Sequence, residues 1–117
     1  MYDVAIIGGG PGGYAAALYA HNFGLKVALV EREQIGGTCL HRGCIPAKSC
    51  LQTAEVFSEV AHAADFGVVT SAPRLDWTAA LERKNAIVDR LHTGLSGLIK
   101  RRKVDVFAGS GRLAGPG

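Results

Sequence analysis

Two cysteines, Cys39 and Cys44, are the residues of this chain best suited to chemistry. A thiolate is a nucleophile and a redox group, and a close cysteine pair in a reducing compartment is more often catalytic or metal-binding than structural. On a regular helix, their spacing of five residues would place the Cα atoms near or beyond the roughly 7 Å limit for a disulfide. A loop or distorted turn must therefore bring the two together, and Gly43 supplies the backbone freedom for it.

The position of Cys44 also bears on its reactivity. Pro46 follows it closely and fits the first turn of a helix that we expect to run from about residue 47 into the early sixties. Cys44 would then lie at the N-terminal end of that helix, where the helix dipole favours the thiolate.

Zinc binding is the competing interpretation of these thiols. Four potential ligands fall within a dozen residues: Cys39, His41, Cys44 and Cys50. Their spacing lacks the C-x2-C knuckle of common zinc sites, so we predict no metal. We interpret Cys50 as a small buried apolar residue on the helix that follows Cys44.

A glycine-rich turn stands upstream of the thiols. Gly8, Gly10 and Gly13 form G-x-G-x-x-G directly after an apolar run at 2–7 and before helix-forming residues. The first glycine permits a tight turn, the second lets the backbone approach a pyrophosphate, and the third lets helix and strand pack closely. The helix N-terminus then offers free N–H groups to phosphates. A nucleotide site so near a dithiol implies electron transfer between a bound dinucleotide and a disulfide.

Glu31 strengthens that interpretation, because a glycine-rich turn alone is a weak signal. It lies roughly 20 residues further on, at the end of a predicted second strand. A carboxylate there accepts hydrogen bonds from ribose hydroxyls and repels a 2′-phosphate, so NADP is disfavoured. FAD and NAD both remain compatible with these residues. The alternative is a structural glycine turn followed by a surface glutamate.

These residues need a framework, which we predict to be an α/β fold of Rossmann type with a parallel sheet. Strands at 2–7 and 26–30 flank a helix that runs from Tyr14 toward a candidate C-cap at Gly24, which makes a βαβ unit. Residues 104–108 form a third strand, in the order 3-2-1. The first strand, normally central, then has one neighbour, and a bare hydrophobic edge is unfavourable. We therefore expect the N-terminal part of a longer protein.

A long amphipathic helix pair is expected between the second and third strands. The helix that begins near residue 47 is its first member, residues 66–70 are a predicted short strand, and Asp76 is the N-cap of the second helix. Apolar residues of the second helix fall on alternating four- and three-residue steps, which are broken only by Lys84: Trp77, Leu81, Val88, Leu91, Leu95 and Leu98. The pattern is short for a coiled coil and favours a surface helix packed on its own domain or on a second subunit.

Size and charge exclude several classes of protein. The 117 residues fit one domain, with no apolar run long enough to span a bilayer and no signal segment, so a cytoplasmic location is the default. The net charge of +3 comes mostly from residues 100–103. A nucleic-acid patch is one interpretation of that run. Cations that offset the dipole at the end of a long helix are the favoured one, so we predict neither nucleic-acid nor membrane partners.

Residues 36–48, which read GGTCLHRGCIPAK, resemble the dithiol segment of the class I pyridine nucleotide–disulfide oxidoreductases. The resemblance extends over nearly the whole chain, although specific motifs occur only at 8–13, Glu31 and 36–48. It implies that the N-terminal site takes FAD and that a second, later motif takes NAD. The residues that match the family's FAD contacts are Gly8, Gly10, Gly12, Gly13, Glu31, Gly37, Thr38, Lys48 and Gly111.

The resemblance also implies a division of labour around the dithiol. Cys39 matches the interchange thiol, which exchanges with the substrate disulfide. Cys44 matches the thiol that lies against the flavin and forms a thiolate–flavin charge-transfer pair. Lys48 matches a lysine near the flavin N5, and a solvated helix lysine is the alternative interpretation of that position.

Other positions inform the subclass. Leu40 and Ile45 favour the branch of the family that acts on dihydrolipoamide, since glutathione and mercuric reductases more often carry valine at both places. Mycothione reductases share much of the motif and stay among the candidates. His41 and Arg42 stand where many family members carry Asn-Val, so we assign them no catalytic role. We interpret His92 as solvated or structural.

The resemblance thus implies an FAD-dependent, NAD-linked disulfide oxidoreductase that oxidises dihydrolipoamide through Cys39 and Cys44. The family works as a homodimer whose acid–base His–Glu pair comes from the partner subunit, and a 2-oxoacid dehydrogenase complex is a candidate assembly. That pair, the NAD-binding domain and the interface domain lie outside residues 1–117, an incomplete FAD-binding domain that we expect to be inactive alone. A non-catalytic nucleotide-binding module and a small metal-binding or redox-sensing protein are the competing classes.

Overall fold

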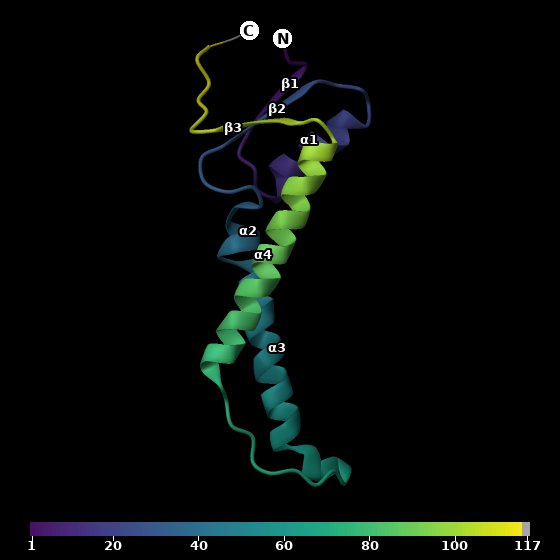
Figure 1. Cartoon of the computed structure of the whole chain (residues 1–117), viewed down its shortest axis with the longest axis vertical. Helices are drawn as coiled ribbons and strands as arrows, with labels where there is room; N and C mark the ends of the chain where they lie inside the picture. Colours follow the sequence, from purple (N-terminus) through teal and green to yellow (C-terminus); the bar gives the residue numbers. More distant parts are fainter. Residues whose placement is uncertain (116–117) are drawn as a thin grey trace.

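The computed structural model describes residues 1–115 and builds them around one parallel sheet. The strands are β1 (Val4–Ile7), β2 (Val27–Glu31) and β3 (Asp105–Ala108). The helices are α1 (Pro11–His21), α2 (Gly37–His41), α3 (Cys44–Ala61) and α4 (Trp77–Arg101), and η1 (Ala63–Phe66) is a 3-10 turn. The strand order is β1-β2-β3, with both pairs parallel (Figure 1). The predicted α/β fold and strand order are confirmed.

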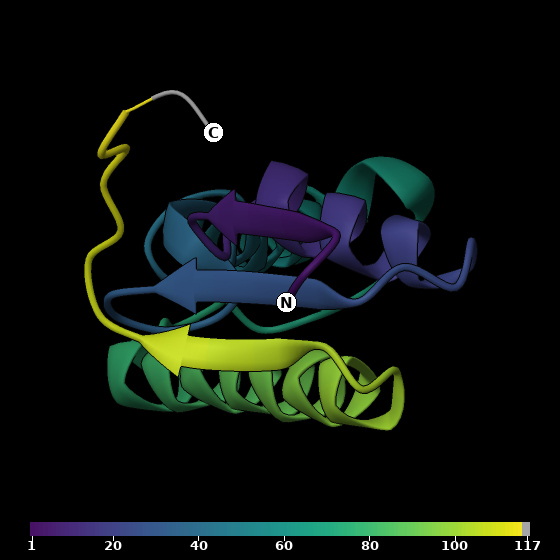
Figure 2. The same ribbon diagram turned by 90° about the horizontal axis from the view of Figure 1, so that it is seen from above.

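The core lies between the sheet and two helices on one of its faces. Figure 2 shows the three parallel strands in front, with α1 behind β1 and α4 behind β3. Leu29 is fully buried in the central strand, and its register partners Ile6 and Val106 point to the same face. Six buried residues form the apolar cluster, which therefore joins the sheet to both helices: Ala17, Val27, Leu29, Ile35, Ile99 and Val104.

The opposite face of the sheet is open among the described residues. Ile7, Val30 and Phe107 are aligned across the three strands on that face. The Ile7 and Phe107 side chains are exposed, and only the chain that follows β3 turns back toward Ile7. The apolar row of Ile7, Val30 and Phe107 is thus only partly covered, and the Tyr2 ring packs against the edge of it at Phe107.

Helix α1 begins earlier than predicted. Pro11 occupies its first turn, three residues before Tyr14, because the fixed φ of proline suits a helix start and no N–H is needed there. The helix ends at His21 with Asn22 as C-cap, and the left-handed Gly24 follows in the turn into β2. The glycine therefore reverses the chain after the helix, and is not itself the cap.

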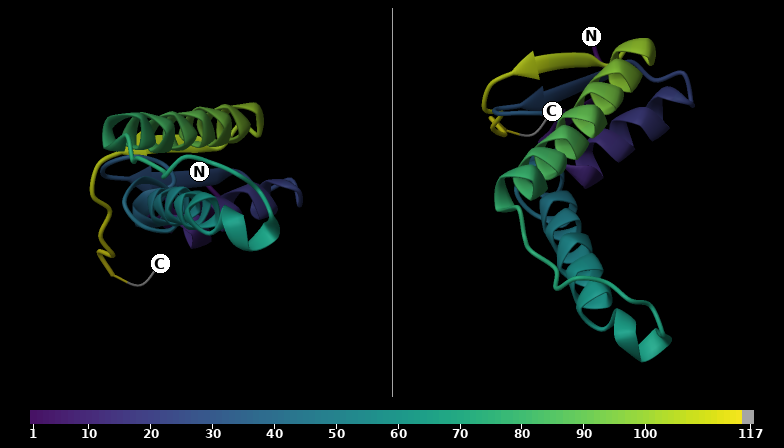
Figure 3. Two further views of the ribbon diagram at one scale, coloured as in Figure 1. Left: turned by 90° about the horizontal axis from the view of Figure 1, so that it is seen from below. Right: turned by 60° about the horizontal axis from the view of Figure 1, so that its bottom comes forward.

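The pair α3 and α4 forms an arm that extends away from the sheet (Figures 1 and 3). The molecule measures 67 × 26 × 21 Å, and its radius of gyration is 20.1 Å. A compact chain of this length would have a radius of gyration of about 13 Å. The predicted helix pair is confirmed, and Asp76 caps α4 as expected: its carboxylate accepts the Ala79 N–H at 3.0 Å.

The tip of the arm corrects one prediction. Residues 66–70 are not a strand: η1 ends at Phe66, Gly67 has a φ of +74°, and irregular chain follows. Val68 and Val69 have strand-like side chains but no neighbouring strand to pair with, and Val69 is 98% exposed. Among the described residues, no helix combines the length and apolarity that crossing a bilayer requires.

Candidate functional site

The glycine-rich turn joins β1 to α1 at the carboxyl end of the sheet. Gly8 has a φ of +100°, which favours glycine, and its N–H donates to the Val30 carbonyl at 2.8 Å. A Cβ on Gly13 would collide with the Gly8 carbonyl oxygen, so α1 can approach β1 this closely only with glycine there. Gly10 and Gly12 have open space where a Cβ would stand. Packing therefore does not require glycine at these two positions. The turn at residues 8–13 instead presents bare backbone to solvent, and we call this surface the cradle.

The N-terminus of α1 faces that cradle without a cap of its own. Gly10 is the N-cap residue, and no side chain accepts a hydrogen bond from the first turn. The first N–H groups of a helix have no partner within the helix. Because the turn is bare and these donors are uncapped, an anionic group is the chemistry that fits here.

Glu31 occupies the end of β2, as predicted, and bridges two backbone segments. Its Oε1 accepts the Glu33 N–H at 2.8 Å, and its Oε2 accepts the Gly9 N–H at 2.7 Å. These two bonds, that from Glu33 first and that from Gly9 next, lower the pKa of the Glu31 carboxyl. The side chain is therefore ionised near neutral pH. Each oxygen keeps a lone pair for a further donor, such as a ribose hydroxyl.

The glycine pair Gly36–Gly37 lies against the glycine-rich turn. Gly36 and Gly37 both have left-handed φ values, +112° and +62°. A Cβ on Gly37 would stand 2.7 Å from the Gly10 Cα, and the Gly36 N–H donates to the Gly9 carbonyl at 2.8 Å. The two glycine segments are thus in direct backbone contact. Thr38 follows in α2, with an exposed side chain.

Cys39 and Cys44 are joined by a disulfide across the bend between α2 and α3. Their Cα atoms lie 4.6 Å apart, within the usual range for such a bond. Gly43 is the N-cap of α3 with a φ of −125° and a ψ of −104°, an irregular conformation that makes the bend. The distorted turn that the spacing required is therefore present.

The two cysteines sit in different surroundings. Cys39 is half-buried in α2, beside an apolar pocket of about 220 Å³ that Leu40, Ile45 and Leu91 help to line. Cys44 is exposed and is the first residue of the 18-residue α3. A thiolate released at Cys44 would face the positive end of that helix.

Two further predictions concern α3. Lys48 lies one turn after Cys44 on the same face of the helix, with an exposed side chain. Cys50 is a free thiol and is half-buried rather than buried, because the arm covers α3 on one side only. In the described part of the chain, no group of three or more His, Cys, Asp or Glu side chains is placed to hold a metal ion.

The chain after β3 completes a cleft at the carboxyl end of the strands. A pocket of about 260 Å³ is lined by Gly8, Glu31 and Gly111, together with Ile7 and Gly109. A Cβ on Gly111 would lie 2.9 Å from the Ile7 Cγ1, so the backbone passes close to the end of β1. Residues from three separate segments of the sequence thus meet in one cleft, at the place where open parallel sheets bind ligands.

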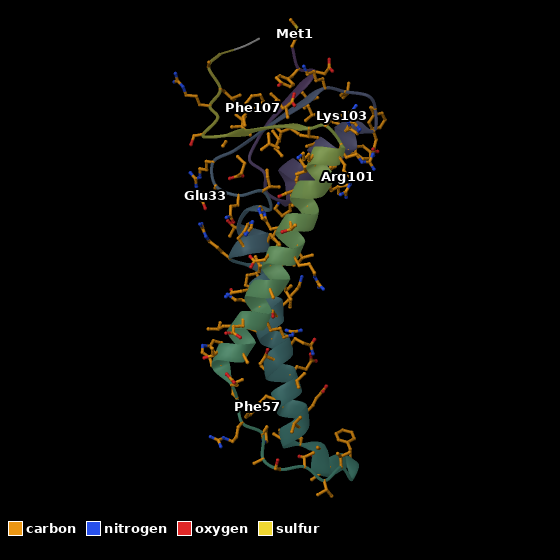
Figure 4. All side chains as sticks on the ribbon, viewed as in Figure 1. Met1, Glu33, Phe57, Arg101, Lys103 and Phe107 are labelled. Atoms are coloured by element: carbon orange, nitrogen blue, oxygen red, sulfur yellow. A yellow bond between two sulfur atoms is a disulfide. The ribbon has the colours of Figure 1, made fainter. Side chains whose placement is uncertain are left out.

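The structure also shows contacts that sequence reasoning missed. His41 Nε2 donates to the Ile35 carbonyl at 2.9 Å, and His92 Nδ1 donates to the same oxygen at 3.0 Å. Arg42 forms an ion pair with Glu33, which lies in the loop after β2 and is labelled in Figure 4. His41 and His92 are 51 residues apart in the sequence, and neither belongs to a motif. No pattern in the sequence could have paired them.

Comparison with known proteins gives a consistent result. The family model described as "Pyridine nucleotide-disulphide oxidoreductase" matches residues 2–117. The chain is 50% identical over 115 residues to a dihydrolipoyl dehydrogenase of Bacillus subtilis (strain 168), covering 98% of this chain and 24% of that protein. It is 49% identical over 113 residues to one of Acholeplasma laidlawii, covering 96% and 34%. For one of Rhizobium etli the identity is 47% over 117 residues, covering 99% and 24%. The chain thus spans only a quarter to a third of these relatives.

Proposed function

Because the chain belongs to the pyridine nucleotide–disulphide oxidoreductase family, we propose that it supplies the flavin site and the redox-active disulfide of an NAD-linked dihydrolipoyl dehydrogenase. One observation carries the proposal: the Cys39–Cys44 disulfide stands at the start of α3, and the glycine segment that precedes it lies against the bare turn of the nucleotide cradle. Because the segment before Cys39 contacts the glycine-rich turn directly, a bound dinucleotide and the dithiol would be close enough to exchange electrons.

FAD is the proposed cofactor, and the cradle fits it. The open space at Gly10 and Gly12 and the uncapped α1 N-terminus suit a pyrophosphate, and the ionised Glu31 suits a ribose. The residues proposed to hold FAD are Gly8, Gly10, Gly12, Gly13, Glu31, Gly37, Thr38, Lys48 and Gly111. Bound FAD would accept two electrons from the cysteine dithiol and pass them to NAD+.

The chemistry proposed for the cysteines is thiol–disulfide exchange. A thiolate of dihydrolipoamide attacks the Cys39 Sγ, the Cys39–Cys44 bond breaks, and Cys44 leaves as a thiolate. The second substrate thiolate then attacks the substrate sulfur of this mixed disulfide. Lipoamide leaves in its disulfide form, and Cys39 and Cys44 remain as the reduced pair. Cys44 is the better leaving group because its thiolate would be stabilised at the N-terminus of α3.

The remaining parts of the proposal concern the protein beyond this chain. The two protons released by the substrate need a base, which the family resemblance assigns to a His–Glu pair of a partner subunit. We therefore propose a cytoplasmic homodimer that uses NAD and a lipoyl group and that can serve a 2-oxoacid dehydrogenase complex. We expect residues 1–117 alone to catalyse no NAD-linked turnover of lipoamide.

The test is a visible absorption spectrum of the full-length gene product, before and after anaerobic reduction with dihydrolipoamide. We expect a bound-flavin spectrum that gains a broad long-wavelength band, which the Cys44→Ser variant lacks. The Cys39→Ser variant should keep such a band, since Cys44 is then a permanent thiol, and should lose NAD-linked turnover. A flavoprotein without the band, and with full activity after Cys39→Ser, would overturn the proposed roles. Turnover with glutathione or mycothiol disulfide in place of lipoamide would correct the substrate.

A further inference from the structure

One backbone carbonyl, that of Ile35, accepts hydrogen bonds from two histidines on different helices. His41 is the last residue of α2, and His92 lies in the C-terminal half of α4. Both rings are half-buried and meet edge to face, with centroids 5.1 Å apart and an interplanar angle of 63°. The pair therefore joins α2, α4 and the loop before Gly36 at a single oxygen.

The acceptor determines which ring nitrogen of each histidine must carry a hydrogen. A carbonyl oxygen can only accept, so His41 must carry a hydrogen on Nε2 and His92 a hydrogen on Nδ1. The oxygen has two lone pairs, and the two histidines occupy both. If either ring moved its hydrogen to the other nitrogen, its hydrogen bond to the Ile35 carbonyl would be lost.

The same peptide unit is held from its other side. The Gly36 N–H donates to the Gly9 carbonyl of the glycine-rich turn at 2.8 Å. The peptide between Ile35 and Gly36 is thus anchored to the nucleotide cradle through its N–H and to α2 and α4 through its C=O. Ile35 itself is buried in the core cluster.

Helix α2 needs such anchoring because it is short. It has five residues and no side-chain cap, and it begins after the left-handed Gly36. A helix this short is not stable by itself, so tertiary contacts must fix its position. In the oxidised state one of these contacts is the disulfide to Cys44. Reduction removes that covalent link. The contacts that then hold α2 include the packing of Leu40, the approach of Gly37 to Gly10 and the hydrogen bond of His41, and the last of these lies at the end of α2 nearest α3.

We propose that His41 and His92 are positioning residues that keep Cys39 beside Cys44 when the disulfide is reduced. The inference rests on the proposed redox function of the cysteines. Two thiols held close have a high effective concentration for disulfide formation. Loss of the pair lets α2 move relative to α3, so that the dithiol becomes harder to oxidise and the disulfide easier to reduce.

The experiment measures the equilibrium of the Cys39–Cys44 disulfide with glutathione redox buffers in the full-length gene product, after alkylation of free thiols and determination of mass. The Cys39–Cys44 disulfide and two molecules of reduced glutathione yield the cysteine dithiol and one glutathione disulfide, so the equilibrium constant gives the reduction potential relative to that of glutathione. For His41→Leu and for His92→Leu we expect disulfide formation to become about tenfold less favourable, which corresponds to a less negative potential by about 30 mV.

Matched variants separate positioning from general damage. Asn at 92 places an N–H donor near the position of Nδ1, whereas Gln displaces it by one methylene. His92→Asn should therefore stay within about twofold of the parent, and His92→Gln should shift like the leucine variant. His41→Gln places its donor near the position of Nε2 and should also be close to the parent. Bound flavin and the thermal midpoint identify the folded variants.

Each result decides the matter. Folded leucine variants with an unchanged equilibrium would overturn the proposal, and so would equal behaviour of His92→Asn and His92→Gln. If the leucine variants do not fold, the Asn and Gln pair decides alone. The readout needs no lipoamide turnover. A shifted potential in a protein that fails to oxidise dihydrolipoamide would therefore refute the proposed substrate and leave the positioning role intact.

Discussion

The sheet end of the molecule and the α3–α4 arm are stabilised in different ways. At the sheet end, buried residues from the strands, α1 and the last turns of α4 form one apolar cluster. In the arm, only Ser49 is buried in α3, and large apolar side chains remain exposed. Figure 4 places Phe107 on the sheet and Phe57 on the arm, far from it. The sheet end is therefore stabilised mainly by burial of apolar side chains. The arm depends more on the hydrogen bonds within its own helices.

The site has parts in both regions. Next to the packed core, the Gly9 N–H donates to the Glu31 carboxylate, and the Gly36 N–H donates to the Gly9 carbonyl. The dithiol lies where core and arm meet, with Cys39 on the short α2 and Cys44 at the start of α3. A redox centre whose two halves belong to regions of different stability depends on the contacts that join them. His92 on α4, which donates to the carbonyl of the core residue Ile35 at 3.0 Å, is one such contact.

The largest difference between the regions should appear on truncating a core leucine. Leu29→Ala removes a fully buried side chain and should lower the free energy of unfolding by about 2–5 kcal/mol. Val56→Ala, at a side chain that is 47% exposed on the arm, should change it by less than about 0.5 kcal/mol. Urea unfolding of the full-length gene product measures both. Equal losses would mean that the arm is as well packed as the sheet.

A matched glycine pair tests the packing of the turn. Gly13→Ala drives a Cβ into the Gly8 carbonyl and should cost about 1–3 kcal/mol or more in the free energy of unfolding. Gly12→Ala meets no atom within 4 Å and should leave that free energy unchanged or slightly raised. Thermal unfolding and flavin titration should be run on both. If Gly12→Ala binds FAD as tightly as the parent, the bare cradle is not where the pyrophosphate lies.

The cap of α4 tests how the arm is held. Asp76→Ala removes the acceptor for the Ala79 N–H and should cost about 1 kcal/mol, confined to the start of the helix. Asp76→Asn keeps an acceptor and should lose less. Hydrogen exchange at Ala79 and Ala80 reports the local opening. No change in their protection would show that tertiary contacts, and not the cap, fix this end of the arm.

The smallest effect concerns pH and Glu31. Its pKa lies below the ordinary value of 4.5 in the folded protein, so the carboxylate adds stability above that value and loses it as the pH falls through the folded pKa. Glu31→Gln should be less stable than the parent at pH 7, and the difference should narrow below pH 4.5. Unfolding midpoints across that range measure it. A constant difference between the two proteins would show that ionisation of Glu31 contributes nothing.

Much of the fold could be read from local patterns. The β-branched runs, the glycine motif and the apolar spacing of α4 are all short-range signals, and they predicted the strands and the long helices. The expected strand at 66–70 failed because Val68 and Val69 have β propensity but no partner strand, and pairing is not encoded locally. The start of α3 at Cys44 rather than near residue 47 reflects the backbone at Gly43.

Residue types and their spacing were enough to identify the reactive groups: a glycine-rich turn, an acidic residue at the end of a strand, and a cysteine pair with a glycine between its members. Their identities and spacings lie within 44 residues of the N-terminus, where local geometry dominates. The contacts that join these parts became visible only in the folded chain. The contact of Gly37 with Gly10, the approach of Gly111 to Ile7, and the shared acceptor of His41 and His92 depend on the sheet and α4 folding back together. Contacts between distant segments produce no repeating pattern in the sequence, because the two residues meet only once the chain has packed.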